Sequence, residues 1–389
     1  MPPKSKKKNN NKKRNTWRTI LHVFLTILTA IAAVGTVAGA FGGNLSPTTY
    51  RYICLMVMTF PLWLILLIII SIADVLWCRK ALFISLIAAI VSAPAIWNFS
   101  PLVLFGPSED KYADCPKIKL LSYNVCNFSA ADSIYPDSTN RTISFIIKTD
   151  ADIVCLQEAM DFSVGKRPET VIHPMQIDTL SRMYPYILLC ERSQMVLSKY
   201  PAKVIPTGYK KKNANEIAPV RITVEGMDIT VFNVHLQPFS LAHHDKELYS
   251  DLTTIDRNDL IKRNNIDSIK SQLLRKIQRA AEGREYDAER LCRYLGSIGG
   301  PNAIITGDFN DVPGCYTLHR LADCNMHEVY PEVGFGPMIT YYDNNFYFRI
   351  DHTLYRGALK PLKMERPSVQ YSDHYPIITT FALTNSYNQ

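Results

Sequence analysis

The segment Ala303-Ile304-Ile305-Thr306-Gly307-Asp308-Phe309-Asn310 shows the pattern from which the fold of this chain can be read. Its apolar, β-branched beginning predicts a buried strand, and polar side chains follow where that strand should end. Polar residues also follow apolar runs at residues 120–125, 152–158, 230–235 and 349–352, and residues 372–374 precede the last predicted strand. One polar residue after a strand is commonly a cap or a turn residue. Six such groups in one chain indicate instead that the strand ends carry chemistry.

The region around this segment alternates short strand patterns with helical ones. Strands are predicted at residues 118–125, 153–156, 186–190, 195–198, 220–224, 229–234, 303–306, 347–354 and 377–383. Helical periodicity is found at residues 141–148, 174–183, 265–281 and 286–295. Many strands with interspersed helices predict a layered α/β (α+β) domain over residues 109–389. The stretch 239–300 is a long excursion between two strands, either a lid or a packed surface element.

Three apolar runs precede this domain and predict a transmembrane region over residues 19–105. They cover residues 20–41, 53–77 and 81–99. A helix of 22 residues rises roughly 33 Å, enough for a hydrocarbon core of about 30 Å. We therefore expect about three transmembrane helices.

The net positive charge of the chain comes from its first 18 residues. The formal net charge is +8, and residues 1–18 carry eight Lys and Arg side chains and no acid. The remainder has 35 basic and 35 acidic groups, and residues 109–389 have 32 and 34. A basic face for nucleic acid is therefore not indicated by composition. The Lys/Asn-rich tail 1–18 is expected to be disordered and to attract anionic lipid head groups.

The distribution of basic residues also predicts an orientation. Lys and Arg favour the cytoplasmic side of a membrane, so the tail should be cytoplasmic and residues 109–389 extracytoplasmic after three crossings, in the periplasm if the source is bacterial. Alternatively, residues 20–40 are a signal peptide cleaved near Ala38-Gly39-Ala40. The large domain lies outside the cytoplasm in both cases. The nine cysteines show no CxxC pair or zinc spacing, and their disulfide pairing is left open.

The polar motifs together resemble those of the metal-dependent endonuclease/exonuclease/phosphatase superfamily, over roughly residues 117–383. This superfamily includes deoxyribonucleases, abasic-site endonucleases, neutral sphingomyelinases and inositol polyphosphate 5-phosphatases. The motifs are Ser-Tyr-Asn124, Leu-Gln-Glu158, Ser-Lys-Tyr-Pro201, Asn-Val-His235, Gly-Asp308-Phe-Asn310, Arg-Ile-Asp351 and Ser-Asp373-His374. The resemblance implies a four-layer α-β-β-α sandwich with its site at one end of the two sheets.

The resemblance also implies a metal site. Glu158 is expected to be the main ligand, with Asn124 assisting and Asp373 positioning this metal or binding a second one. Mg²⁺ prefers oxygen ligands and often takes only one or two carboxylates. Mg²⁺ is therefore the expected cofactor, with Mn²⁺ as an alternative.

Five further residues are expected to act on a phosphoester. The resemblance implies that Asp308 orients or deprotonates the attacking water and that Asn310 donates to the phosphoryl oxygens. It implies that His374, aligned by Asp351, contacts the scissile phosphate or acts as acid or base. It also implies that His235 protonates the leaving group or stabilises the transition state. The neighbouring His352 is interpreted as structural.

The substrate is left open between three hypotheses. The favoured one is a membrane-anchored phosphodiesterase or phosphatase acting on a lipid or another small phosphoester. The second is an extracytoplasmic nuclease for DNA or RNA, for which Lys210-Lys211-Lys212 offers a local basic cluster. The third is a non-catalytic binding protein on the same fold, which the complete set of site residues disfavours.

Overall fold

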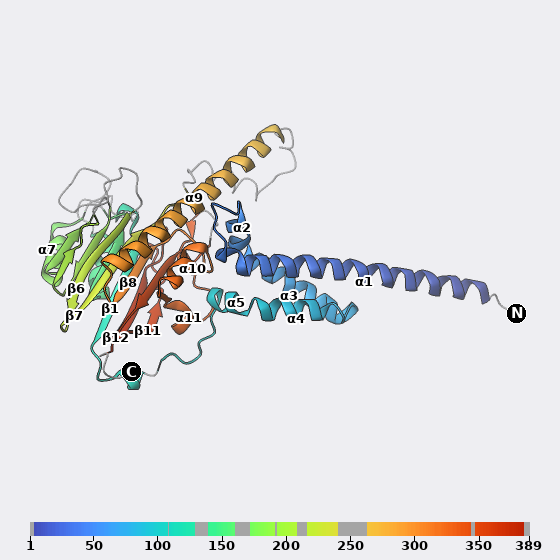
Figure 1. Cartoon of the computed structure of the whole chain (residues 1–389), viewed down its shortest axis with the longest axis horizontal. Coiled ribbons are helices and arrows are strands. Elements are labelled where there is room, and N and C mark those ends of the chain that lie inside the picture. The colour runs from blue at the N-terminus through green and yellow to red at the C-terminus, as the bar shows by residue number, and fades with distance from the viewer. Residues whose placement is uncertain are drawn as a thin grey trace. The chain divides into compact units, whose positions relative to one another are not determined.

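The computed structural model describes residues 4–107, 109–128, 139–159, 172–190, 193–207, 216–239, 263–343 and 347–384. The predicted basic cluster at residues 210–212 lies outside these ranges. The chain divides into two compact units, residues 1–97 with 314–316 and residues 98–313 with 317–389 (Figure 1).

The first unit is helical. Its helices are α1 (Lys4–Phe41), α2 (Ile53–Met58), α3 (Phe60–Trp77), α4 (Leu82–Val91) and α5 (Ala93–Phe99), the last ending just inside the second unit. Residues 4–18 of the basic tail, for which disorder was predicted, are described as the beginning of α1. Lysine and arginine are good helix formers and no proline follows Pro3 in this segment, so the helix of the apolar run continues into the basic one.

Two of these helices are long and apolar enough to cross a membrane, over residues Thr16–Asn44 and Phe60–Trp77. A third crossing is present if α4 and α5, which are bent by 63° at Ser92, count as one span. Pro94 explains the bend, because its ring lacks an N–H and clashes with the carbonyl of Ile90. The predicted span at 53–77 is likewise divided, just before Pro61.

Small residues let α1 approach its neighbours closely. A Cβ atom at Gly35 would lie 2.3 Å from the ring of Trp63, and one at Gly39 would lie 2.8 Å from the carbonyl oxygen of Met56. Close backbone approach at glycines is a common mode of packing between membrane helices. The buried carboxylate of Asp74 accepts a hydrogen bond from Thr29 Oγ1 at 2.7 Å, which joins α3 to α1.

The second unit contains two six-stranded sheets. The first has the order β11-β12-β1-β2-β4-β3 and the second β5-β6-β7-β8-β10-β9. The strands of the first are β1 (Lys117–Asn124), β2 (Ile153–Gln157), β3 (Tyr186–Leu189), β4 (Met195–Ser198), β11 (Leu359–Glu365) and β12 (Ile377–Leu383). Those of the second are β5 (Ala202–Val204), β6 (Glu216–Val224), β7 (Met227–His235), β8 (Ala303–Asp308), β9 (His327–Glu328) and β10 (Asp351–Arg356).

The sheets pack face to face, and helices cover them on the outside (Figure 1). The core between the sheets is formed by side chains such as Leu120 and Ile153 from the first and Val231 and Ile304 from the second. Helices α6 (Arg141–Thr149) and α7 (Pro174–Met183) cover the first sheet. Helix α9 (Arg263–Ser297) lies on the side of the second, where Arg356 of β10 donates to the carbonyl of Leu295. Helix α10 (Tyr316–Asp323) is joined to α9 by a disulfide, and the short α11 (Tyr330–Val333) packs near β11. The predicted sandwich of two sheets between helices is thus confirmed.

Helix α9 corrects one prediction. The segments 265–281 and 286–295, predicted as two helices, form one continuous helix. Gly283 lies between them and does not interrupt the helix, although glycine costs about 1 kcal/mol relative to alanine inside a helix. A Cβ at this position would lie 2.8 Å from Gln237 Cγ, so the glycine allows α9 to pack closely against the segment that follows β7.

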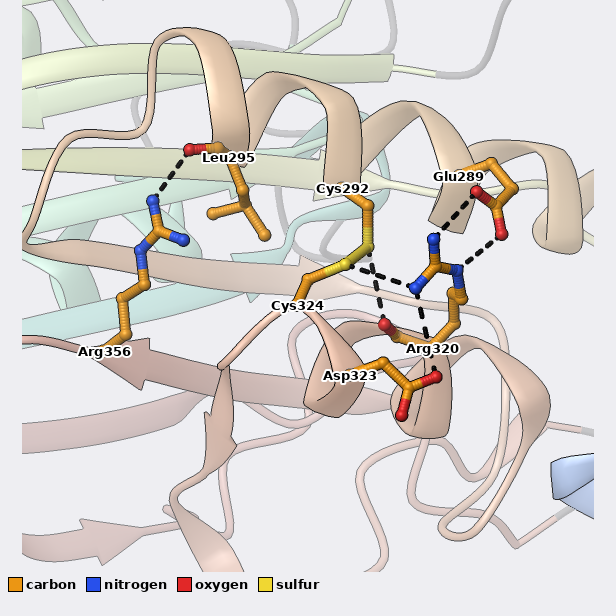
Figure 2. The surroundings of a disulfide bond; sticks show 7 residues. All are labelled: Glu289, Cys292, Leu295, Arg320, Asp323, Cys324 and Arg356. Carbon is orange, nitrogen blue, oxygen red and sulfur yellow. Dashed lines mark hydrogen bonds and ion pairs between the residues drawn. A yellow bond between two sulfur atoms is a disulfide. The ribbon is translucent and has the colours of Figure 1, made fainter.

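A disulfide fastens α9 to the end of α10 (Figure 2). Cys292 and Cys324 are joined across 32 residues of sequence, and the enclosed segment includes all of β8. Beside the disulfide, Arg320 makes a bidentate ion pair with Glu289 of α9, with nitrogen–oxygen distances of 2.5 and 3.2 Å. The excursion 239–300 thus ends in a helix that is fastened to the folded domain.

Candidate active site

The topology brings the predicted site residues to one end of the two sheets. Strand β1 runs parallel to β2, and β7 runs parallel to β8, so the carboxyl ends of each pair meet at a common edge. His235 lies opposite Asp308 in the register of β7 and β8. Because β10 is antiparallel to β8, its first residue, Asp351, also lies opposite Asp308. The polar residues after the strands therefore converge.

Gly307 makes the close approach of β8 to β7 possible. It has φ +140°, and a Cβ at this position would lie only 2.1 Å from the carbonyl oxygen of Val234. No other residue can occupy this position without displacing one of the two strands. The glycine of the Gly-Asp308-Phe-Asn310 motif thus sets the position of Asp308.

The amide of Asn124 joins carboxylates from both sheets. Its Nδ2 donates to Glu158 Oε1 and to Asp308 Oδ2, each at 3.1 Å, while its Oδ1 accepts from the backbone N–H of Cys126. His235 lies at the same place, with Nε2 3.8 Å from both carboxylates. Glu158 has a left-handed backbone conformation, with φ 50°. The half-buried Glu158 and the buried Asp308 are thereby held beside one another.

His374 forms the other side of this group. Its Nδ1 lies 2.9 Å from Asp351 Oδ2, and its Nε2 lies 3.5 Å from Asp308 Oδ2. The ring of Tyr341 packs edge-on against the imidazole at 5.0 Å. Burial disfavours the charged imidazole, but the carboxylates of Asp351 and Asp308 outweigh this effect and raise the pKa of His374 to about 10. The side chain is therefore an imidazolium at neutral pH.

Asn310 and Asp373 are attached to this group at its edges. Asn310 donates its backbone N–H to Asp308 Oδ1 at 2.8 Å and a side-chain N–H to the carbonyl of Leu236 at 3.2 Å. Ser372 Oγ lies 3.1 Å from Asp373 Oδ1 and 2.7 Å from the carbonyl oxygen of Asn124. Each of the eight residues singled out from the sequence is therefore connected to this end of the sandwich.

The donor groups fit a hard divalent cation. The carboxylates of Glu158 and Asp308 converge on one amide group, and oxygen ligands of this kind suit Mg²⁺. In the part of the chain that the structure describes, the ligand atoms of Asp308, Asp351 and His374 also lie within 4.8 Å of one another. Two of these, His374 and Asp351, are hydrogen-bonded to each other.

Several polar residues that were not predicted from the sequence hold the strands of the site together. Gln157 Nε2 donates to Asn233 Oδ1 at 2.6 Å, and Asn233 Nδ2 donates to the carbonyl of Leu156 at 2.9 Å, so these side chains join β2 to β7. Thr340 Oγ1 accepts from the backbone N–H groups of Ile350 and Asp351. Asn233 belongs to the Asn-Val-His235 motif, which was the available signal for it.

A second network of hydrogen-bonded polar side chains contacts the loop that carries Asn310. His352 lies 2.9 Å from Glu328 Oε1 through Nδ1 and 3.0 Å from the carbonyl oxygen of Asp311 through Nε2. The carboxylate of Asp311 accepts from Arg284 Nε at 3.0 Å. His352 thus has the structural place that the sequence suggested, and it braces the loop that carries Asn310.

A family of known proteins matches much of this chain. The family model described as "Endonuclease/Exonuclease/phosphatase family" matches residues 121–374. No curated protein matches the chain. Similar solved structures include an endonuclease/exonuclease/phosphatase from Beutenbergia cavernae, with 17% identity, a TM-score of 0.45 and coverage of 69% of this chain and 72% of the other.

Two further structures show similar levels of likeness. A protein of the same description from Bacteroides vulgatus has 15% identity, a TM-score of 0.42 and coverage of 69% and 99%. A humanized D. rerio TDP2 has 14% identity, a TM-score of 0.41 and coverage of 68% and 98%. The family model spans more than half of the chain and includes all eight site residues. The protein belongs to the endonuclease/exonuclease/phosphatase family.

Proposed function

We propose that this protein is a membrane-anchored hydrolase that cleaves a phosphoester of a lipid or another small molecule outside the cytoplasm. The observation that carries the proposal is the position of the buried Asp308 carboxylate. It lies within 4 Å of an imidazolium, an amide and a second imidazole, from His374, Asn124 and His235. A carboxylate held in this way can accept a proton from water beside groups that donate to a phosphate.

The proposed metal site is formed by Glu158, with Asp373 contributing, and Asn124 assists by holding the Glu158 carboxylate through its Nδ2. Mg²⁺ is the expected ion and Mn²⁺ the alternative, because the ligands are hard oxygen donors. When bound, such an ion neutralises charge on the phosphoryl oxygens. The remaining residues of the site determine how water and substrate are held.

Those residues can divide the proton transfers among themselves. Asp308 orients the attacking water and takes its proton, while His374 donates to a phosphoryl oxygen through Nε2. Asp351 holds the His374 ring through Nδ1. Asn310 uses one side-chain N–H for Leu236 and has a second for the phosphoryl group. His235, which is only partly buried, is placed to protonate the leaving oxygen.

The extracytoplasmic location is supported by two independent observations. The basic residues before the first apolar helix favour a cytoplasmic amino terminus. The disulfide between Cys292 and Cys324 is a bond that persists in oxidising compartments. Two reporter enzymes can be fused after Gln389, one that is active only outside the cytoplasm and one that is active only inside it. The first should be active. Activity of the second alone would refute this orientation.

The substrate class can be tested with the full chain in detergent and Mg²⁺. The panel should contain sphingomyelin, phosphoinositides, a generic chromogenic phosphodiester, DNA and RNA, with His374→Ala as the inactive control. Turnover of a lipid or small phosphoester that requires His374 and stops with a chelator supports the proposal. Rapid cleavage of DNA or RNA without lipid turnover would instead identify a nuclease. No turnover of any kind in a folded protein would favour the non-catalytic alternative.

The pH dependence of activity should follow the protonation of His374. Its raised pKa keeps the imidazolium present below about pH 10 and removes it above that value, so kcat should fall on the alkaline side near pH 10. Asp351→Asn removes one of the carboxylates that raise this pKa and should move the alkaline limb down by roughly one to three pH units. A kcat–pH profile of both proteins measures the shift. An alkaline limb unchanged by the substitution would contradict the assignment.

Loss of the disulfide should destabilise the domain that carries β8. Replacing both Cys292 and Cys324 by serine is expected to lower the free energy of unfolding by about 2–4 kcal/mol, because the bond closes a loop of intermediate length. Thermal melting with and without a reductant measures the effect. The reductant should lower the Tm of the parent and leave that of the double variant unchanged. An equal response in both would show that the bond is absent or carries no stability.

A further inference from the structure

Two short apolar segments pair with each other, residues 101–105 after the helical region and residues 334–336 after α11. We call them the apolar ribbon. Val103 N–H donates to the carbonyl of Gly334 at 3.1 Å, and Gly336 N–H donates to the carbonyl of Pro101 at 2.7 Å. Leu102 therefore lies opposite Phe335 in an antiparallel bridge. The ribbon is part of the second unit, and its backbone hydrogen bonds give it a defined conformation.

The side chains of this ribbon are unusually exposed for apolar residues. Their exposed fractions are 57% for Leu102, 73% for Leu104, 90% for Phe105 and 63% for Phe335. We call these four residues the Phe105 patch. Single exposed apolar side chains are ordinary on protein surfaces, whereas several together on one short ribbon mark a surface that contacts a partner.

The chemistry of the surroundings selects the kind of partner. Residues 81–108 and 333–342, which contain both strands of the ribbon, carry no charged side chain. Nucleic acid requires Lys or Arg contacts to its phosphates, so it does not fit this surface. Exposed apolar side chains on two uncharged segments fit the boundary between head groups and acyl chains of a lipid bilayer.

The path of the chain places such a boundary within reach. Helix α5 ends at Phe99 and belongs to the bent helix pair that can act as a membrane span. Leu102 follows three residues later, and three residues extend over at most roughly 11 Å. The patch is therefore tethered close to the point where the chain would leave the bilayer.

We propose that the Phe105 patch inserts into the lipid interface and holds the catalytic domain on the membrane surface. This inference rests on the proposed membrane anchoring. Insertion of the patch would also keep the active site near the membrane. Phe335 precedes Thr340 by five residues, and Thr340 accepts a hydrogen bond from the backbone N–H of Asp351. Five residues span at most roughly 18 Å, so Thr340, which holds the site residue Asp351, lies within that distance of Phe335. Phosphoesters in lipid head groups are the substrates that such an arrangement presents to the active site.

The test uses tryptophan emission from the full chain in phosphatidylcholine/phosphatidylglycerol nanodiscs, with and without bromine in the acyl chains. The variant Phe105→Trp adds one reporter to the patch, and Phe335→Trp adds one to its other strand. The control is Met175→Trp on α7, where the side chain is 70% exposed. The native tryptophans of the helical unit, such as Trp63 and Trp77, report membrane insertion in every sample.

The added emission of Phe105→Trp and Phe335→Trp should be lost to brominated lipid to the same degree as the native emission. That of Met175→Trp should remain. If the native emission is quenched and neither patch reporter is, the anchoring holds and the patch proposal is wrong. Blue-shifted patch emission that resists quenching would mean that protein, such as a second copy, covers the surface, which also overturns it. If no emission is quenched, both the anchoring and the patch proposal fail.

Discussion

Asp308→Asn is expected to lower kcat by roughly 10²–10⁴-fold, the contribution typical of a general acid–base group. The substitution preserves the size of the side chain but removes its ability to take a proton from water. It also removes a negative charge 3.5 Å from His374 Nε2, so the imidazolium loses part of its stabilisation. Asp308 is buried at the end of β8, and its carboxylate lies within 4 Å of the side chains of Asn124, His235 and His374. Steady-state kinetics on whichever substrate the panel identifies gives kcat and KM separately.

The matched control is Asp178→Asn on α7. This carboxylate is exposed and pairs only with the exposed Arg182 one turn away among its described contacts. Its replacement should leave kcat and KM unchanged. If Asp308→Asn retained the parent's kcat, with a fold confirmed by circular dichroism, the proposed role of Asp308 would be excluded.

Arg284→Met is expected to lower the free energy of unfolding by about 3–5 kcal/mol, because it leaves a buried carboxylate without its charged partner. Arg284 is 1% exposed, and its Nε lies 3.0 Å from Asp311 Oδ2. The same guanidinium donates to the carbonyl of Gln237 and stacks over the ring of Phe239 at 4.5 Å. It therefore connects α9 both to the loop after β8 and to the beginning of the excursion.

Chemical denaturation of the full chain in detergent, followed by near-ultraviolet circular dichroism, measures this loss. Arg182→Met is the control, since Arg182 lies exposed on α7 and should change stability little. The double variant Arg284→Met/Asp311→Asn should recover part of the loss, because no charge is then left buried. A double variant no more stable than Arg284→Met alone would contradict this account.

Strands were predicted best where several apolar residues follow one another in the sequence. The continuous apolar run at 195–198 became β4 with the same bounds. The strand predicted at 347–354 begins only at Asp351, because the residues before it belong to the loop that contacts Thr340. Strand β11 was missed because Lys360, Pro361 and Lys363 give it the appearance of a loop. Edge strands tolerate proline and lysine, so their local sequence carries a weaker signal.

The convergence of the site residues could be predicted from the sequence, whereas the contacts that support them could not. Asn124 and Asp308 end their strands and Glu158 follows one, and parallel strands in one sheet end on the same side. The Arg284–Asp311 pair joins a helix to a loop 27 residues away. No periodicity relates two such positions, since their proximity depends on how α9 packs. The disulfide was likewise open, because spacing alone does not determine pairing.

The Asn124 amide has a consequence for when activity can first arise. Its two carboxylate partners come from different sheets, Glu158 after β2 and Asp308 at the end of β8, and the His374–Asp351 pair also bridges the sheets. A chain that has formed only one sheet holds half of each pair. Under the proposed function, a nascent polypeptide is inactive until residues 117–383 have been made and both sheets have docked, so the onset of hydrolysis would report the completion of folding.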